Sequence, residues 1–202
     1  MNKSVIKIKN TSFTRCTSKR LGGLIYVFQG SLLLENSSAL DFTNGGISSD
    51  ESHMLISDST FTNGVSKNQE ATVMCKICPT FRIERSTFQN NQSGMGGAVS
   101  IFAMSFEPID ETFAILESNF INNTAESAGA ILSNDHILNI ENSVFQNNTS
   151  GSNGGALILQ CESFDNCRFN LTNNTFTYNS AKSDGGAISW IDIMPQLDSN
   201  QF

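Results

Sequence analysis

The sequence predicts an all-β protein, a single-stranded right-handed parallel β-helix of about seven coils, and three observations support this prediction. A short apolar motif recurs along the 202 residues at a period in the range, roughly 20–50 residues, that is typical of solenoids. A glycine-rich motif follows most copies, and no stretch has the spacing of an amphipathic helix. Crossovers between parallel strands are right-handed. We therefore expect residues 1–202 to form one elongated unit.

Each coil is expected to begin with two strands that meet at a bend. Apolar residues lie seven and five positions before a phenylalanine, and a small polar residue lies two positions before it. Apolar residues two apart share one face of a strand, but the five-residue step is odd, so a bend must return the phenylalanine to the interior. We expect one interior stack of rings, formed by Phe61, Phe88, Phe120, Phe145 and Phe176 and extended by Phe13.

The second half of each coil is expected to turn at glycines. The motif is glycine followed by a small and an apolar residue, as in Gly22–Leu24, Gly96–Val99, Gly129–Ile131, Gly154–Leu157 and Gly185–Ile188. Glycine permits positive φ and a close approach of neighbouring backbones. Asparagine tolerates left-handed corners, and stacked asparagines can hydrogen-bond along a column. We expect such corners at Asn63, Asn90, Asn122, Asn147 and Asn179.

Two parts of the chain depart from this pattern. Within residues 27–52, Ala39 stands where phenylalanine is due and Phe42 follows three residues later, so we expect an irregular coil that carries a small insertion. From about residue 195 the motif starts again, with Leu197 and Phe202 five residues apart. We expect a fragment of a longer repeat protein, in which flanking coils of the same chain cover both ends.

Composition limits the classes of partner. The net charge is −7, and nucleic-acid binding needs a basic face, so no nucleic-acid partner is expected. No run of about 18 apolar residues is present, and we expect no membrane span in this segment. The first residues lack the apolar core of a signal peptide. Nothing in the sequence indicates a cofactor.

Four of the five cysteines form two close pairs, Cys75 with Cys78 and Cys161 with Cys167. Local disulfides, free thiols and zinc ligands are all open interpretations of these pairs. A zinc site would need both pairs together, yet their coils are three apart, or about 14 Å at the usual spacing of strands. No metal is therefore expected, and Cys16 is left over, either free or paired with a group outside this segment.

Asn-x-Ser/Thr sequons are frequent, and the candidate glycosylation sites are Asn36, Asn91, Asn122, Asn148 and Asn173. Two interpretations remain open. A repeat rich in Asn, Ser and Thr generates sequons by chance, whereas a surface protein in a secretory pathway would carry glycans at some of them.

Two recurring motifs connect the chain with known proteins. One is GGAI at Gly185–Ile188, and the other is FxxN at Phe88–Asn91, Phe120–Asn123 and Phe145–Asn148. With them the chain resembles parallel β-helix proteins of the pectin-lyase-like superfamily. More narrowly, it resembles the polymorphic outer-membrane protein repeats of chlamydiae, and it is similar to large surface proteins of protists. The resemblance implies an extracellular or surface-displayed protein that is often adhesive.

We therefore expect a non-enzymatic, extracellular or cell-surface module for adhesion or interaction, with a protein or glycan ligand. The loops that vary between coils are the expected binding face; they are Ser66–Gln69, Phe106–Glu111, Asn134–His136, Cys161–Cys167 and Asp192–Gln196. His53 is expected to face solvent, and Asp135 and His136 are expected in a turn.

A carbohydrate-active enzyme or polysaccharide binder is the alternative. Its carboxylates would occupy equivalent positions in nearby coils, and Glu84 and Glu141 are the best pair, two layers or about 10 Å apart. Solvated strand charges explain the same two residues, because Arg82 and Arg85 can neutralise Glu84. A third hypothesis is a structural spacer of a large surface protein, which has no ligand.

Overall fold

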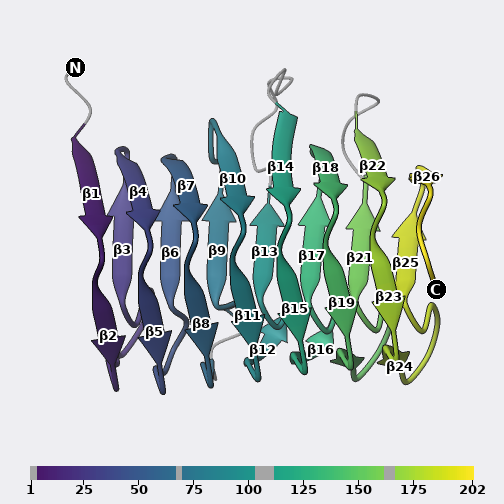
Figure 1. The fold of residues 1–202 in the computed structure, drawn as a ribbon, viewed down its shortest axis with the longest axis horizontal. Coiled ribbons are helices and arrows are strands. Elements are labelled where there is room, and N and C mark those ends of the chain that lie inside the picture. The colour runs from purple at the N-terminus through teal and green to yellow at the C-terminus, as the bar shows by residue number, and fades with distance from the viewer. Residues whose placement is uncertain (1–3, 67–69, 103–111, 162–166) are drawn as a thin grey trace.

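The structure is a computed structural model that describes residues 4–66, 70–102, 112–161 and 167–202. Figure 1 shows strands stacked along one axis, with the two chain termini at opposite ends of the stack. Over the described residues the strands pair only in parallel and form four sheets, and no helix is present. The fold is the predicted right-handed parallel β-helix. No helix in this part of the chain is long and apolar enough to cross a membrane.

The longest sheet, sheet A, contains eight strands, one from each layer. Its inward positions hold the paired apolar residues of the repeat, such as Leu138 and Ile140, which are fully buried. Its strands are β1 (Val5–Lys9), β4 (Ser31–Glu35), β7 (His53–Ser57), β10 (Phe81–Glu84), β14 (Thr112–Leu116), β18 (Ile137–Glu141), β22 (Arg168–Thr172) and β26 (Gln196–Asp198).

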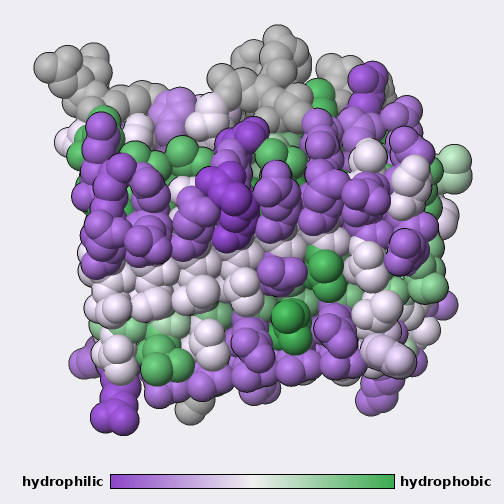
Figure 2. Space-filling view, in the orientation of Figure 1, coloured by the Kyte–Doolittle hydropathy of each residue, from purple (hydrophilic) through white to green (hydrophobic). Residues whose placement is uncertain are grey.

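Sheet B follows after a sharp bend and carries the phenylalanine column inside. Its strands are β2 (Ser12–Thr14), β5 (Ser38–Leu40), β8 (Thr60–Thr62), β11 (Thr87–Gln89), β15 (Asn119–Ile121), β19 (Val144–Gln146) and β23 (Thr175–Thr177). The outward residues of these seven strands include no charged side chain. Figure 2 shows them as a mostly pale band, below the hydrophilic side chains that gather along the edge of sheet A.

Two further sheets complete each coil. Sheet C is short and contains β12 (Gln92–Met95), β16 (Thr124–Ser127), β20 (Thr149–Ser150) and β24 (Ser180–Ala181). Sheet D contains β3 (Ile25–Phe28), β6 (Ile47–Asp50), β9 (Val73–Lys76), β13 (Val99–Phe102), β17 (Ile131–Asn134), β21 (Leu157–Gln160) and β25 (Ile188–Ile191).

Glycine turns lead from sheet C into sheet D. The first glycine of the motif has a positive φ, 58° at Gly96 and 62° at Gly154. The second glycine faces the backbone of the next coil, because a Cβ on Gly97 would lie 2.2 Å from the carbonyl oxygen of Gly129. Both roles expected of the glycine pairs are therefore present.

The predicted ring stack forms the centre of the interior. Consecutive rings from Phe61 to Phe176 lie 4.8 to 5.2 Å apart and within 6° of parallel. Phe202 adds a sixth ring, 5.2 Å from Phe176, as expected for a coil that starts near residue 195. Phe13 lies in the same column but is separated from the stack by Ala39, so the expected extension to Phe13 is wrong.

A ladder of buried small polar side chains, the serine ladder, holds the bend between sheets A and B. The Ser86 N–H donates to Ser118 Oγ (3.2 Å), and the Ser118 hydroxyl donates to the Leu116 carbonyl (2.7 Å). The N–H contact repeats along the whole chain, through Thr11, Ser37, Ser59, Ser86, Ser118, Ser143, Asn174 and Asn200. The separations along it, 26, 22, 27, 32, 25, 31 and 26 residues, are the coil lengths. Seven complete coils are therefore present.

The insertion expected within residues 27–52 is wrong. The coil from Ser37 to Ser59 is the shortest, with 22 residues. Phe42 is buried in the layer beside Gly64, where a Cβ would lie 2.2 Å from the tip of the Phe42 ring. Phe42 therefore fills, from another position, the interior volume that the small Ala39 side chain leaves.

A second ladder of buried amides, the asparagine ladder, holds the corner between sheets B and C. Asn123 Oδ1 accepts from the Asn91 N–H (3.1 Å), and Asn123 Nδ2 donates to the Phe88 carbonyl (3.0 Å). Asn148 and Asn179 continue the pattern. The preceding residue makes the left-handed corner, with φ between 53° and 57° at Asn63, Asn90, Asn122 and Asn147. The left-handed corner expected at Asn179 is wrong, because Tyr178 (φ 56°) occupies it.

Replacing Phe120 by Ala tests the ring stack. Phe120 is completely buried, so Phe120→Ala is expected to lower the free energy of unfolding by about 3–5 kcal/mol through lost burial and the remaining cavity. Urea unfolding followed by circular dichroism measures the change. The neighbouring outward variant Ile121→Ala is the control and should lose much less; equal losses would contradict an interior stack.

The two end faces predict self-association of the isolated 202-residue chain. Val5 and Phe28 are exposed at one end, and Met194 and Phe202 at the other, with exposed fractions of 54% or more. Unpaired strand edges beside apolar faces favour stacking of one copy on another. Light scattering should report a mass that rises with concentration, and Phe202→Lys should reduce it. A constant monomer mass at high concentration would contradict this prediction.

Candidate functional site

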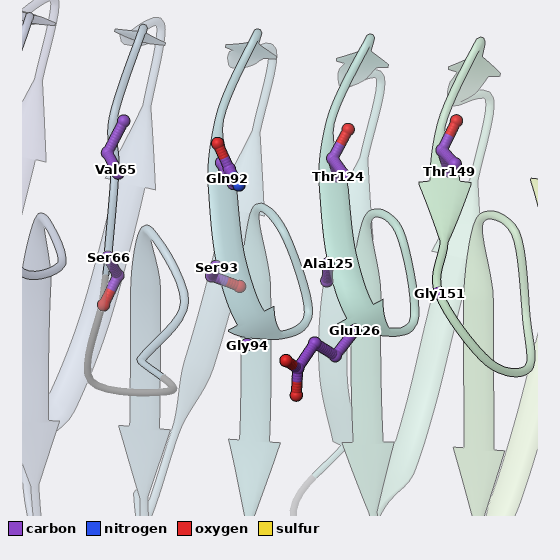
Figure 3. A pocket seen from close by; sticks show the side chains of 10 residues that line it. All are labelled: Val65, Ser66, Gln92, Ser93, Gly94, Thr124, Ala125, Glu126, Thr149 and Gly151. Atoms are coloured by element: carbon purple, nitrogen blue, oxygen red, sulfur yellow. The ribbon is translucent and has the colours of Figure 1, made fainter.

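The candidate site is a groove of about 720 Å³ that runs along the outer side of sheet C. Figure 3 shows that its residues come from four successive coils, which contribute Val65, Gln92, Thr124 and Thr149 at equivalent positions. Val65 pairs with Gln92, Gln92 with Thr124, and Thr124 with Thr149. Three steps of this kind span about 14 Å along the helix axis. We call this feature the sheet C groove.

Strand alternation separates the floor of the groove from its rim. Ser66, Ser93 and Ala125 are buried, whereas Gln92, Thr124 and Thr149 are exposed. The Ser93 hydroxyl donates to the carbonyls of Met95 and Gly96, both at 3.1 Å, which satisfies it inside the coil. Ser66 is 8% exposed, and its Oγ has no hydrogen-bond partner among the described residues. One buried hydroxyl at one end of the groove therefore lacks a hydrogen-bond partner within the part of the chain that the structure describes.

Glu126 supplies the charge in the groove. Figure 3 shows its side chain reaching from β16 towards Gly94, and the residue is exposed. Gly94 and Gly151 present only backbone at equivalent points of the coils on either side, so nothing larger than a glycine crowds the carboxylate there. The described lining residues thus combine hydroxyl and amide groups on the rim with one acidic group.

The two candidate catalytic carboxylates lie elsewhere, on the outer edge of sheet A. The register joins Glu84 to Leu116 and Leu116 to Glu141, which agrees with the two-layer separation expected. Glu84 forms ion pairs with Arg82 and with Arg85 Nη1 (2.9 Å). The hydrogen bond from Arg82 has the largest effect and lowers the pKa of Glu84; burial, the next in size, raises it, and the hydrogen bond from Arg85 lowers it further, so the pKa lies below its usual value. A general acid needs the opposite shift.

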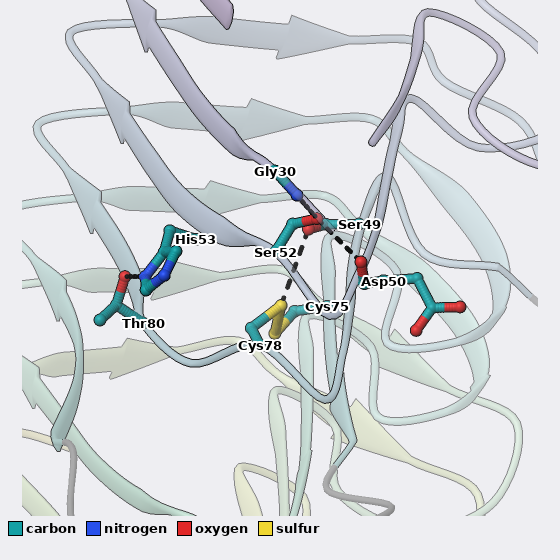
Figure 4. The surroundings of a disulfide bond; sticks show 8 residues. All are labelled: Gly30, Ser49, Asp50, Ser52, His53, Cys75, Cys78 and Thr80. Carbon is teal, nitrogen blue, oxygen red and sulfur yellow. Dashed lines mark hydrogen bonds between the residues drawn. A yellow bond between two sulfur atoms is a disulfide. The ribbon is translucent and has the colours of Figure 1, made fainter. Parts of the chain in front are cut away.

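The cysteine pairs lie at the corner between sheets D and A. The structure joins Cys75 to Cys78 and Cys161 to Cys167 by disulfide bonds, and Cys16 is free. Figure 4 shows the first disulfide beside Ser49, whose Oγ lies 3.8 Å from Cys78 Sγ, with His53 and Thr80 nearby. His53 occupies an outward position of β7, where it is half-buried, and its Nδ1 lies 3.0 Å from Thr80 Oγ1.

Asp135 and His136 form the expected turn, between β17 and β18, but this turn is buried. They are 7% and 2% exposed, and Asp135 Oδ1 lies 3.9 Å from Cys167 Sγ. The His136 ring stacks on Phe113 at a centroid distance of 4.4 Å. Burial lowers the pKa of His136 to about 4, so the ring is neutral at pH 7. Segment Asn134–His136 is therefore part of the packed corner, and its assignment to a binding face is wrong.

Two of the five candidate glycosylation sites are also wrong. Asn91 and Asn148 belong to the asparagine ladder, are at most 1% exposed, and donate from Nδ2 to the carbonyls of Phe61 and Phe120. A glycan on Nδ2 would have no room in the interior. Asn36, Asn122 and Asn173 are exposed at left-handed corners, where each Nδ2 donates to the Oδ1 of an asparagine in the preceding coil.

The remaining expected loops are described only in part. Residues 67–69 of the first loop, all of Phe106–Glu111 and residues 162–166 of the cysteine loop lie outside the described residues. Asp192–Gln196 is exposed over most of its length, with Met194 at 73%. Among the described residues of these loops, only Ser66 lines the groove.

Sequence reasoning missed the groove itself. Its outward residues lie four and six positions after the anchor phenylalanine, as Thr124 and Glu126 follow Phe120. The sequence could have shown these residues, because the positions four and six after each phenylalanine can be compared between copies of the repeat. The groove is concave because of how the whole coil packs, and no short stretch of sequence indicates this curvature.

The fold and its ladders define a β-helix repeat protein. Within it, residues 142–157 and 175–189 match the sequence profile of the Chlamydia polymorphic membrane protein repeat. These stretches run from the bend before Phe145 to Leu157, and from Thr175 to Ser189, so they cover corresponding parts of two successive coils. A comparison with curated proteins gives no match.

The buried histidine predicts a specific pH dependence of stability. The folded pKa is about 4 and the unfolded value about 6.5, so between these pH values the unfolded chain binds a proton that the folded chain does not. The free energy of unfolding should therefore fall as the pH falls from about 6.5 to 4, by on the order of 3 kcal/mol from this group.

The variant His136→Phe keeps the ring stack and removes the titration. Urea unfolding at several pH values should show a shallower slope between pH 4 and 6.5 in this variant than in the parent chain. His53→Gln is the control and should keep the parent slope. If His136→Phe kept the full slope, the assignment of the slope to His136 would be refuted.

Proposed function

We propose that the chain is a non-enzymatic module of an extracellular or cell-surface protein, and that it binds a protein or glycan ligand through the sheet C groove. The observation that carries this proposal is that, within each coil, the residues that build the fold are separate from those that line the groove. The residues that define the repeat are buried in the ring stack and the two ladders. The outward positions of sheet C differ in chemistry from coil to coil and still line one continuous groove.

The similarity to the Chlamydia repeat supports a surface location. That repeat is named for membrane proteins, and its matched part here includes Thr149 and Gly151 of the groove. The exposed sequons at Asn36, Asn122 and Asn173 are compatible with passage through a secretory pathway.

The runner-up function, a polysaccharide lyase or hydrolase, has weaker support. Glu84 is held ionised by two arginines, and Leu116 separates it from Glu141. Glycoside hydrolysis needs one carboxyl group with a raised pKa facing a second across the scissile bond. The arrangement on sheet A instead resembles a solvated ion-pair network, which also includes Asp58.

Adhesion of protein-coated beads tests the proposal. Beads that carry the chain should be retained on at least one member of a panel of immobilised matrix proteins, glycans and cultured cells. Gly151→Phe should abolish most of this retention, because its side chain would occupy the groove. A Cβ at Gly151 would meet the backbone of Glu126 at 3.5 Å, an ordinary van der Waals contact, so the first atom of the new side chain fits without a clash.

Glu117→Gln, at an exposed corner outside the groove, is the control and should keep full retention. The same preparations should release no reducing sugar from a panel of polysaccharides. Sugar release would overturn the proposal in favour of an enzyme, with Glu84 and Glu141 as the residues to replace. No retention and no release would overturn it in favour of a structural spacer.

A further inference from the structure

The groove is part of a longer uncharged column on the outside of the coils. The register extends it from Gln92, Thr124 and Thr149 in both directions, and the whole column is Thr17, Thr43, Val65, Gln92, Thr124, Thr149 and Ser180. All of these residues are exposed except Val65, which is half-buried. One hydroxyl or amide group is thus presented per coil in six of seven layers, at a spacing of about 4.8 Å.

A regular column of this kind suits a polymer whose own polar groups repeat along its length. The rim offers hydroxyl and amide groups, which both donate and accept hydrogen bonds. The Glu126 carboxylate, standing two residues after Thr124 on the same face, only accepts, and its bonds from hydroxyl groups are charge-assisted. The buried Ser66 hydroxyl without a partner adds a further polar group at one end of the floor.

The same features argue against other classes of ligand. An anionic polymer would meet Glu126 and a chain of net charge −7. An added peptide strand has no free edge here, because β16 is paired with β12 on one side and β20 on the other. An amphipathic helix needs an apolar groove, and among the lining residues that the structure describes only Val65 and Ala125 carry apolar side chains.

We propose that the sheet C groove binds a neutral, extended oligosaccharide that lies along the helix axis, with Glu126 accepting hydrogen bonds from adjacent sugar hydroxyls. This inference rests on the proposed function and names its ligand. The sugar chain lies over Gln92, Thr124 and Thr149, and a longer chain continues over Ser180. Gly94 and Gly151 leave room for the sugar rings on either side of the carboxylate.

Titration calorimetry with defined sugars tests the inference. The probes are the neutral β-1,4-linked series from chitobiose to chitohexaose and from cellobiose to cellohexaose, with tetragalacturonate as the acidic counterpart. At least one neutral series should bind, with an affinity that rises with length and levels off once the chain spans the groove. Tetragalacturonate should bind at least tenfold more weakly.

Three variants locate the site. Glu126→Gln should lower the affinity about tenfold, as expected for the loss of a charge-assisted hydrogen bond. Gly151→Phe should abolish binding, and Glu117→Gln, the matched control for charge, should leave it unchanged. Circular dichroism melting curves confirm that each variant is folded before the affinities are compared.

Failure of this inference is distinguishable from failure of the proposed function. If coated beads adhere through the groove but neither neutral series binds, the ligand is not a neutral β-1,4-linked oligosaccharide and only this inference is overturned. It is also overturned if tetragalacturonate binds more tightly than the neutral probes, or if Gly151→Phe binds them as well as the parent chain does.

Discussion

The structure depends on how the chain satisfies buried backbone groups where it bends. Strand residues pair with the coils above and below, but at a bend the N–H groups leave the regular pattern while remaining inside the protein. A buried N–H without a partner costs roughly 1–3 kcal/mol. The serine ladder supplies one side-chain acceptor in every layer, as Ser118 does for Ser86. The asparagine ladder does the same in the later coils, where the acceptors are Asn91, Asn123, Asn148 and Asn179. The bends are therefore fixed to the same height in all coils.

This constraint explains which features of the coil are regular and which are free. The ladders and the ring stack tie each layer to the next at the bend and at sheet B, while the coil length varies from 22 to 32 residues elsewhere. The outward side chains of sheet C take no part in the serine ladder or the asparagine ladder. The columns on sheet C can accordingly carry Gln92 in one coil and Thr124 in the next without disturbing the fold, and a recognition surface can be built there.

Much of the fold could be predicted from sequence, because its rules are local and repeated. The apolar spacing and the polar residue two before each phenylalanine placed the strands of sheets A and B and the ring stack. Errors arose where one residue compensates for another in space. Phe42 fills the space beside Ala39 in the shortest coil, and Tyr178 takes a corner that asparagine occupies elsewhere. Neither exchange can be recognised from the sequence, because it depends on how the coils stack.

The candidate site was harder to predict, since it depends on shape and burial. Asp135, His136, Asn91 and Asn148 are polar and were assigned to the surface, yet the packing of adjacent coils buries all four. The groove residues have ordinary polar side chains, and only their alignment over four coils makes them a site.

Amide hydrogen exchange followed by NMR tests most directly whether the ladders hold the bends. The account predicts that the N–H groups of Ser86 and Asn91, which lie between strands, exchange as slowly as those within β11. In Ser118→Ala the Ser86 amide alone should lose its acceptor and exchange much faster, while Asn91 stays protected by Asn123. Fast exchange of both amides in the parent chain, at the rate of exposed turns, would contradict the account.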